Sequence, residues 1–257
     1  MKLFKNECYK LFRTKKLYIF AGIHLFFIVV NLLSYKPGLD EDTIWTFTNG
    51  QSAPLALAEI YVQFMMFFIP IFIADTISRE YQQGTLKLSL LYPVDRNQLI
   101  KAKIMSLMVM ILSLTVFFLV VSYALGVYHL GWGNVFEYEG LSYGTIKGIF
   151  ITIGSYLILT VPAMAYGIFV ICLALMTGDQ ISTIIGSSGL MILGMNLNGI
   201  SIGNPYSPAY HFSYLYRFFV FENMGRDGII AIIMTFVYLF IFTSISFLSF
   251  KKKDLVY

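Results

Sequence analysis

The chain has 257 residues, of which 58% are hydrophobic and only 12% are charged, and its mean hydropathy is +0.73. Soluble domains are typically ~45–50% apolar, so this composition excludes an ordinary soluble domain and indicates an integral membrane protein. The formal net charge is +4. We expect one membrane domain over residues 1–257, and we expect it to be all-α because its apolar runs are long and continuous.

The first sixteen residues combine basic and apolar side chains at helical spacing. Lysines and Arg13 occupy most of the polar positions. This pattern predicts an amphipathic helix over 1–16 that lies on the inner leaflet and fixes the topology of the chain. Its apolar positions are Leu3, Phe4, Cys8, Leu11 and Phe12.

Six apolar runs near or above ~18 residues predict membrane-spanning helices. Pro162 lies inside the long fourth run and predicts a bend there. Most of the 18 Lys and Arg residues precede the first run, connect the second to the third, or follow the sixth. The positive-inside rule places these segments, and therefore both termini, in the cytoplasm. The runs are 17–34, 54–74, 102–128, 145–176, 181–202 and 228–250.

The connection over residues 75–101 is the longest charged segment inside the chain. Helix-compatible residues run to Gln83, Gly84 breaks the helix, and Thr85 caps a second turn that Pro93 stops. A capping box then starts the next helix. The pattern predicts an ordered elbow, and we expect another protein to contact it.

The spacing of Glu80, Gly84-Thr85-Leu86, Pro93, Arg96 and Lys103 resembles the signature of the ABC-2 family of ABC transporter permeases. The resemblance implies a coupling helix between spans 2 and 3 that docks on a separate ATPase. Glu80 and Arg96 would hold the elbow, Gly84 would set its bend, and the leucines would enter a groove on the ATPase. The implied coupling residues are Glu80, Gly84, Thr85, Leu86, Leu88, Leu90, Pro93 and Arg96.

The family resemblance also implies the partners and the location. The chain has no G-x-x-x-x-G-K-[ST] motif, so it holds no cofactor itself, and ATP and Mg would bind to the partner ATPase. Two ATPase copies and a second permease copy or a paralogue are implied, in the bacterial cytoplasmic membrane. The helix over 1–16 resembles one that braces the ATPase, which is the alternative to simple membrane anchoring.

The segment 203–227 is long and aromatic and carries few charges, although it lies on the outer side. We expect it to dip back into the outer leaflet, because its backbone groups need shielding by protein. It resembles the re-entrant outer gate between spans 5 and 6 of ABC-2 exporters, and an interfacial aromatic belt is the alternative. The gate candidates are Pro205, Tyr206, Pro208 and Tyr210.

Polar residues inside the predicted spans are costly and mark either a translocation path or contacts between helices. His24 and Asn31 share one helical face, Glu59 and Gln63 are four residues apart, and Asn196 lies near the end of the fifth run. That run is also rich in small residues, which favour close packing within the chain or a dimer seam.

The function predicted from the resemblance is the permease of an ATP-driven exporter, without enzymatic activity of its own. Stand-alone permeases of this size resemble exporters of bacteriocins, phenol-soluble modulins or bacitracin-type drugs, which implies an amphipathic peptide or hydrophobic antimicrobial as client. The alternatives are a sodium or small-drug exporter, an autonomous channel or carrier, and a membrane enzyme. Charges at the span ends disfavour a carrier, and no nucleophile or metal motif supports an enzyme. Topology explains the basic residues, so no nucleic-acid role is expected.

Overall fold

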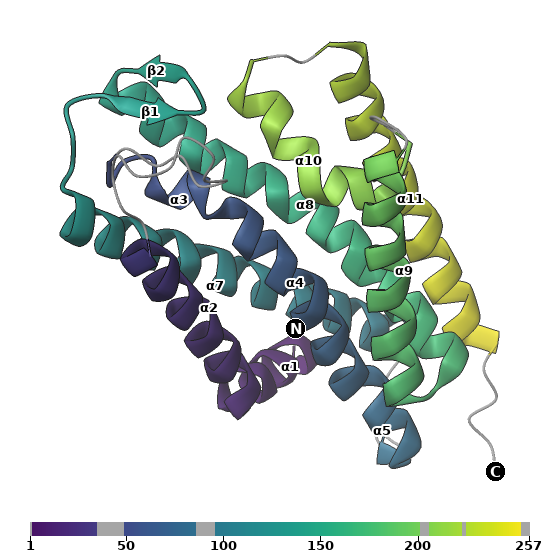
Figure 1. Ribbon diagram of the computed structural model, residues 1–257. Coiled ribbons are helices and arrows are strands. Elements are labelled where there is room, and N and C mark those ends of the chain that lie inside the picture. Colours follow the sequence, from purple (N-terminus) through teal and green to yellow (C-terminus); the bar gives the residue numbers. More distant parts are fainter. Residues whose placement is uncertain (1, 35–48, 86–95, 201–205, 223–224, 253–257) are drawn as a thin grey trace.

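The structure, a computed structural model, describes residues 2–34, 49–85, 96–200, 206–222 and 225–252, which are helical apart from one short hairpin and connecting turns (Figure 1). The helices are α1 (Lys2–Arg13), α2 (Lys15–Ser34), α3 (Ala53–Ala56), α4 (Ala58–Ile73), the π-helical turn η1 (Ala74–Ser78), α5 (Arg79–Gln82), α7 (Arg96–Leu130), α8 (Thr145–Thr177), α9 (Gln180–Ile200), α10 (Pro208–Val220) and α11 (Arg226–Lys252).

Five helical stretches in the described part of the chain are long and apolar enough to cross a membrane. They correspond to the first, second, third, fourth and sixth predicted runs. The fifth run forms α9, which packs against α4, α8 and α10. The helical membrane architecture is therefore confirmed, and the crossing by α9 stays a prediction. The five stretches are Lys15–Ser34, Ala58–Gln82, Asn97–Leu130, Thr145–Thr177 and Arg226–Lys251.

The core lies between α4 and α8, the two most buried of these helices. Tyr61 on α4 packs against Phe118 of α7 and Tyr156 of α8. A buried phenol needs a hydrogen-bond partner. The Tyr61 hydroxyl pairs with Thr115 Oγ1 at 2.6 Å, and Tyr156 donates to the Pro54 carbonyl oxygen at 2.6 Å. The first bond fixes α4 against α7, and the second fixes α3 against α8.

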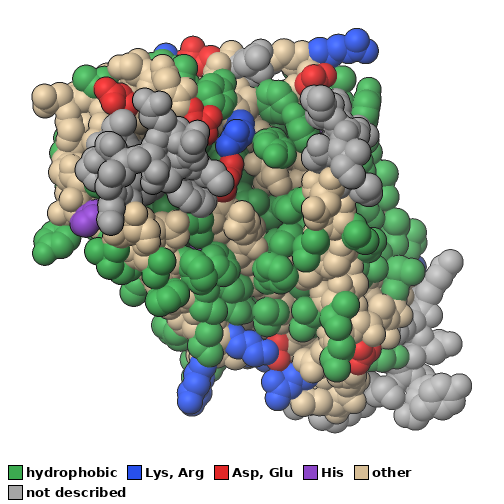
Figure 2. Space-filling view, in the orientation of Figure 1, with side chains coloured by type: hydrophobic (Ala, Val, Ile, Leu, Met, Phe, Trp, Pro, Cys, Tyr) green, Lys and Arg blue, Asp and Glu red, His purple; other side chains and the backbone are tan. Residues whose placement is uncertain are grey.

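The bundle has two ends that differ in charge. We call the end with α1, α5 and the C-terminal end of α11 the basic end, and the opposite end, with the two strands and α10, the hairpin end (Figure 1). Figure 2 shows Lys and Arg side chains at the lower, basic end with a few acidic ones, and a wide hydrophobic surface above them. This layout matches a bundle whose middle faces lipid.

The described chain is all-α in class, as predicted, and it departs from helix and turn in one short hairpin, where β1 (Phe136–Tyr138) pairs antiparallel with β2 (Leu141–Tyr143). The two-residue turn between them, Glu139 and Gly140, has φ of 45° and 80°. Two positive φ angles are typical of a type I′ turn, which matches the twist of a hairpin. Strands of three residues give too little alternation for the sequence pattern to reveal them.

Helix boundaries also differ from the apolar runs at the basic end. The second apolar run ends at Ala74, but its helix continues through η1 and α5 to Gln82. Helix α7 begins at Arg96, as the predicted capping box implies, before the third apolar run begins at Ala102. Hydropathy falls where charged residues begin, but those residues still favour a helix. At the fourth span, α8 runs through Pro162 without interruption.

The segment before α3 lies against the turn that follows α7. The Gly50 amide donates to the Gly131 carbonyl oxygen at 2.8 Å, and Asn49 Nδ2 donates to the Val135 carbonyl oxygen at 2.6 Å. A Cβ atom on Gly50 would lie 2.6 Å from backbone atoms of Gly131 and Val127. This close approach requires glycine, because backbone atoms cannot move aside as a flexible side chain can.

We expect Gly50→Ala to destabilise the protein by about 1–3 kcal/mol, since the added methyl group overpacks a backbone contact. Gly22→Ala is the matched control, because no atom lies within 4 Å of its added Cβ and alanine favours a helix. The measurement is the thermal unfolding midpoint in detergent. Equal midpoints for the two variants would contradict the packing argument.

Candidate functional site

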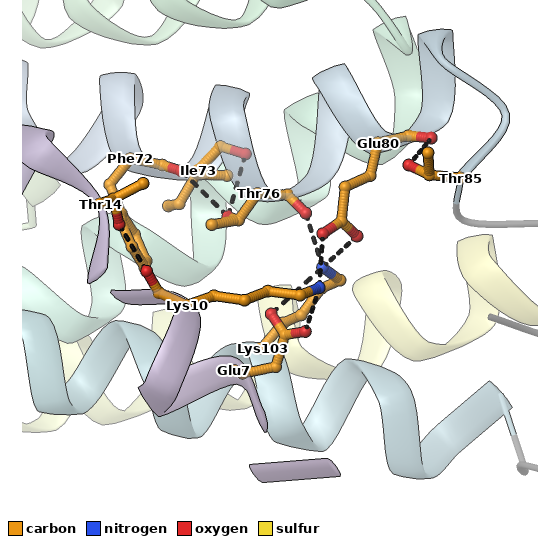
Figure 3. Close-up of polar contacts among 9 residues, drawn as sticks. All are labelled: Glu7, Lys10, Thr14, Phe72, Ile73, Thr76, Glu80, Thr85 and Lys103. Atoms are coloured by element: carbon orange, nitrogen blue, oxygen red, sulfur yellow. Dashed lines mark hydrogen bonds and ion pairs between the residues drawn. The ribbon is translucent and has the colours of Figure 1, made fainter. Parts of the chain in front are cut away.

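A buried lysine joins three helices at the basic end. Lys103 on α7 is only 3% exposed. Its Nζ lies 2.6 Å from the Thr76 carbonyl oxygen, 2.7 Å from Glu80 Oε2 and 3.5 Å from Glu7 Oε2 (Figure 3). An ammonium group has three donors, and a buried charge is tolerated only when it is paired and hydrogen-bonded. Lys103 therefore holds α1 and the end of the second span against α7.

Lys10 completes this arrangement from α1. Its Nζ lies 2.9 Å from Glu7 and 3.1 Å from Glu80, so each carboxylate contacts both lysines. Burial lowers the pKa of Lys10, but its hydrogen bonds and charge attraction to Glu7 and Glu80 outweigh burial and raise that pKa above its ordinary value. We call Glu7, Lys10, Glu80 and Lys103 the basic-end network; its two positive and two negative charges balance.

Further polar contacts surround the basic-end network. Asp75 in η1 pairs with Lys16 at 2.6 Å and with Arg79 at 3.1 Å. On the other side of α5, Gln82 Nε2 donates to Asp179 Oδ1 at 2.7 Å. The Ser182 amide donates to Asp179 at the start of α9 and helps to lower the pKa of that carboxyl group. Helix α5 is thus tied to α1, α7 and the start of α9.

The helix that ends with α5 breaks where the sequence predicted. Gly84 has φ of +69° and no neighbouring atom within 4 Å of a Cβ position. Glycine adopts this left-handed backbone without steric cost. Thr85 Oγ1 then donates to the Glu80 carbonyl oxygen at 3.2 Å. The chain therefore leaves a firmly held helix through a sharp turn.

The predicted coupling residues are only partly described by the structure. Glu80, Gly84 and Thr85 lie together at the end of α5. Arg96 begins α7, but its side chain is not described. Sequence reasoning counted Lys103 in the family signature without giving it a role, and it missed Glu7, the sole acidic residue among the first sixteen. Outside the described residues lie Leu86, Leu88, Leu90 and Pro93.

The N-terminal helix buries Glu7 together with part of its predicted apolar face. Leu11 is buried as expected, but Phe12 is 47% exposed and Glu7 is only 6% exposed. The reason is the pairing of Glu7 with Lys103, which the apolar periodicity does not reveal. Helix α1 therefore packs on α7 through a polar contact as well as an apolar one.

The polar residues predicted for the first and fifth spans do not share one cavity in the structure. His24 is fully buried among aromatic rings that include Tyr61 and Phe68, and neither ring nitrogen has a hydrogen-bond partner in the described part of the chain. Asn31 donates to the Phe27 carbonyl oxygen on its own helix. Asn196 likewise donates to the Ile192 carbonyl oxygen and is exposed.

Glu59 and Gln63 do line one pocket, at the hairpin end. Its volume is about 190 Å³. Glu59 Oε1 pairs with Arg217 of α10 at 2.5 Å, and Glu139 in the hairpin turn approaches the same guanidinium at 3.5 Å. Sequence reasoning missed Arg217, although it is the one basic residue in α10. The pocket is lined by Glu59, Val62, Gln63, Met195, Ser213 and Tyr214.

The predicted gate segment contains α10, which begins at Pro208. Tyr210 packs against Tyr214 on the same helix, with ring centroids 5.1 Å apart. The Tyr206 carbonyl oxygen accepts a hydrogen bond from the Tyr238 hydroxyl of α11. Pro205 lies outside the described residues. An apolar cavity of about 240 Å³ is lined by residues at the start of α10 and by residues of α8, α9 and α11.

Comparison with known proteins gives one family match. A family model described as "ABC-2 family transporter protein" matches residues 3–194, which include α1 and most of α9. The matched region contains the whole basic-end network and the hairpin. No curated protein matches the chain.

We expect Lys103→Met to destabilise the protein by about 3–5 kcal/mol, because it removes the buried cation and leaves Glu7 and Glu80 to share Lys10 alone. The control is Lys101→Met, two residues earlier on α7, where the side chain is exposed. Thermal unfolding in detergent measures both. A loss of stability for Lys101→Met as large as that for Lys103→Met would contradict the assigned role of the buried ammonium.

Proposed function

The chain belongs to the ABC-2 transporter family, and we propose that it is the membrane-spanning permease subunit of an ATP-driven exporter. The family match over residues 3–194 carries this proposal. The five long apolar helices support it, because a permease must cross the bilayer several times.

In this proposal α9 is the sixth span and the basic end is cytoplasmic, so that both termini lie inside the cell. The concentration of lysines at the basic end supports this orientation under the positive-inside rule. The membrane would be the bacterial cytoplasmic membrane. The segment 203–227 would re-enter the outer leaflet and act as an outer gate, with α10 as its helical part.

The energy for transport would come from two copies of a separate ATPase that bind ATP and Mg. We propose that the ATPase docks on residues 86–95, where the leucines and Pro93 follow the turn at Gly84. Movement of that segment would reach α5 first. Because Glu80 joins α5 to Lys103 on α7 and to Lys10 on α1, the displacement would move three helices together.

A second permease copy or a paralogue would complete the transport path. Gly186 and Gly189 on α9 support this part of the proposal, since no atom lies within 4 Å of a Cβ position at either glycine. Small residues that face away from their own chain allow another helix to approach closely. Gly194 differs, because its Cβ position meets Ala209 of α10.

We propose an amphipathic peptide or a hydrophobic antimicrobial as the client. The apolar cavity beside α10 supports a client with a hydrophobic part, because such cavities bind apolar groups. A sodium or small-drug exporter is the alternative within the family.

We expect the permease to co-purify with an ABC ATPase produced in the same cells, and expect Leu86→Ser combined with Leu88→Ser to abolish this co-purification. Leucines that enter a groove on a partner lose their apolar contacts when replaced by serine. The measurement is the amount of ATPase retained on tagged permease in detergent, with thermal unfolding of the same samples.

The control is Ile146→Ser combined with Phe150→Ser, at two exposed positions near the start of α8, at the hairpin end of the bundle. If the control retains the ATPase and the elbow variant of equal stability does not, the result supports docking on residues 86–95. Equal retention by both variants places the ATPase elsewhere. Absence of the ATPase from the wild-type preparation as well would contradict the exporter proposal itself.

A further inference from the structure

The pocket at the hairpin end contains the chemical groups that bind an organic ammonium ion. The Glu59 carboxylate, the Gln63 amide and the Ser213 hydroxyl supply oxygen acceptors, and the ring of Tyr214 supplies an aromatic face. Ammonium groups bind to carboxylates by charge-assisted hydrogen bonds and to aromatic faces by cation–π attraction.

The cation that now uses these groups comes from the protein itself. Arg217 pairs with Glu59, and its guanidinium carbon lies 5.7 Å from the centre of the Tyr214 ring. One cation therefore contacts both the carboxylate and the aromatic face. Both partners keep about a third of their side-chain surface exposed, at 34% for Glu59 and 31% for Arg217, so a solute can reach them.

The charges around Glu59 allow another cation to replace Arg217 there. Glu59, Glu139 and Arg217 together carry one net negative charge. If another cation bound to Glu59, Arg217 would still face Glu139, which already lies 3.5 Å away. Neither charge would then be left unpaired, and an unpaired, partly buried charge is the main cost of breaking such a pair.

Glu139 is held near Arg217 by the hairpin turn. It is a non-glycine residue at φ 45°, a conformation that costs free energy and persists when surrounding contacts hold it. Its carboxylate approaches Arg217 Nη2, the nitrogen that also pairs with Glu59, from the hairpin turn. The hairpin thus keeps a second acceptor for Arg217 in place.

We propose that Glu59 binds an organic ammonium group of the transported molecule, and that Arg217 occupies this position when no such molecule is bound. Ammonium binding would transfer Arg217 from Glu59 to Glu139 and so release the contact between α10 and α4. This inference rests on the proposed function, which makes the bound molecule a transported client. The binding itself can be measured on the permease alone.

The size of the pocket suits the polar end of a client. Its volume of about 190 Å³ exceeds the ~150 Å³ of an engineered cavity that holds benzene. A phenylalkyl ammonium ion therefore serves as a probe. The neutral alcohol of the same skeleton tests whether the charge or the apolar part is recognised.

The experiment is calorimetric titration of the full-length permease in lipid nanodiscs with 2-phenylethylammonium and, separately, with 2-phenylethanol, after subtraction of empty nanodiscs. We expect saturable binding of the ammonium ion to the wild type and none of the alcohol. Glu59→Gln should bind the ammonium ion roughly tenfold more weakly or worse, because it loses a charge-assisted hydrogen bond. Arg217→Gln should bind it more tightly, because the internal competitor is gone.

The double variant Glu59→Gln with Arg217→Gln controls for misfolding, because it removes both members of the ion pair and leaves neither residue as an unpaired charge. The double variant should also lose ammonium binding. Glu137→Gln is the matched control, an exposed carboxylate in β1 that makes no contact with Arg217. It should bind like the wild type. Wild-type affinity in the double variant, equal binding of the alcohol, or equal loss in Glu137→Gln would overturn the proposal.

Co-purification of the ATPase, measured on the same variants, separates this inference from the proposed function. Loss of ammonium binding with the ATPase retained would reject the client chemistry alone. Ammonium binding without any ATPase would keep the binding site and reject the exporter.

Discussion

The need to satisfy one buried ammonium group determines the architecture of the basic end. Lys103 lies on a helix long enough to cross a membrane, and at 3% exposure water cannot solvate its charge. A charge in that position must find carboxylates and carbonyl oxygens from neighbouring elements. Glu7 and Glu80 meet this need only if α1 lies along α7 and the second span continues past Ala74. The placement of three helices therefore follows from one side chain.

Charge and hydropathy divide the protein into regions with different roles. The middle of the bundle relies on apolar packing and on buried phenols that pair with hydroxyl and carbonyl groups, as at Tyr61 and Tyr156. Ion pairs gather at the two ends, where helices must be held in register but also allowed to move. An ion pair can exchange partners without losing packing area, whereas an interdigitated core cannot. The ends are thus the parts of this bundle best suited to switching.

Composition and apolar runs were enough to predict helices, a membrane protein and the break at Gly84, because these depend on local sequence. The ion pairs could not be predicted in the same way. Glu59 and Arg217 are 158 positions apart, and no periodicity links them. The sequence did mark the individual residues, since Glu7 stands alone in a basic helix and Glu59 in an apolar one. What it lacked was the pairing, which only the packing of the helices provides.

The π-helical turn η1 controls the direction in which the charges beyond it point. A residue added to an α-helix rotates everything that follows by about 100° around the helix axis. The wider turn over Ala74–Ser78 therefore sets the rotation of Arg79 and Glu80 relative to α4. For this protein, inserting or deleting one residue there would change helix length only slightly. Its main effect would be to turn Glu80 away from Lys103, so this stretch of the gene is constrained in length more strictly than in composition.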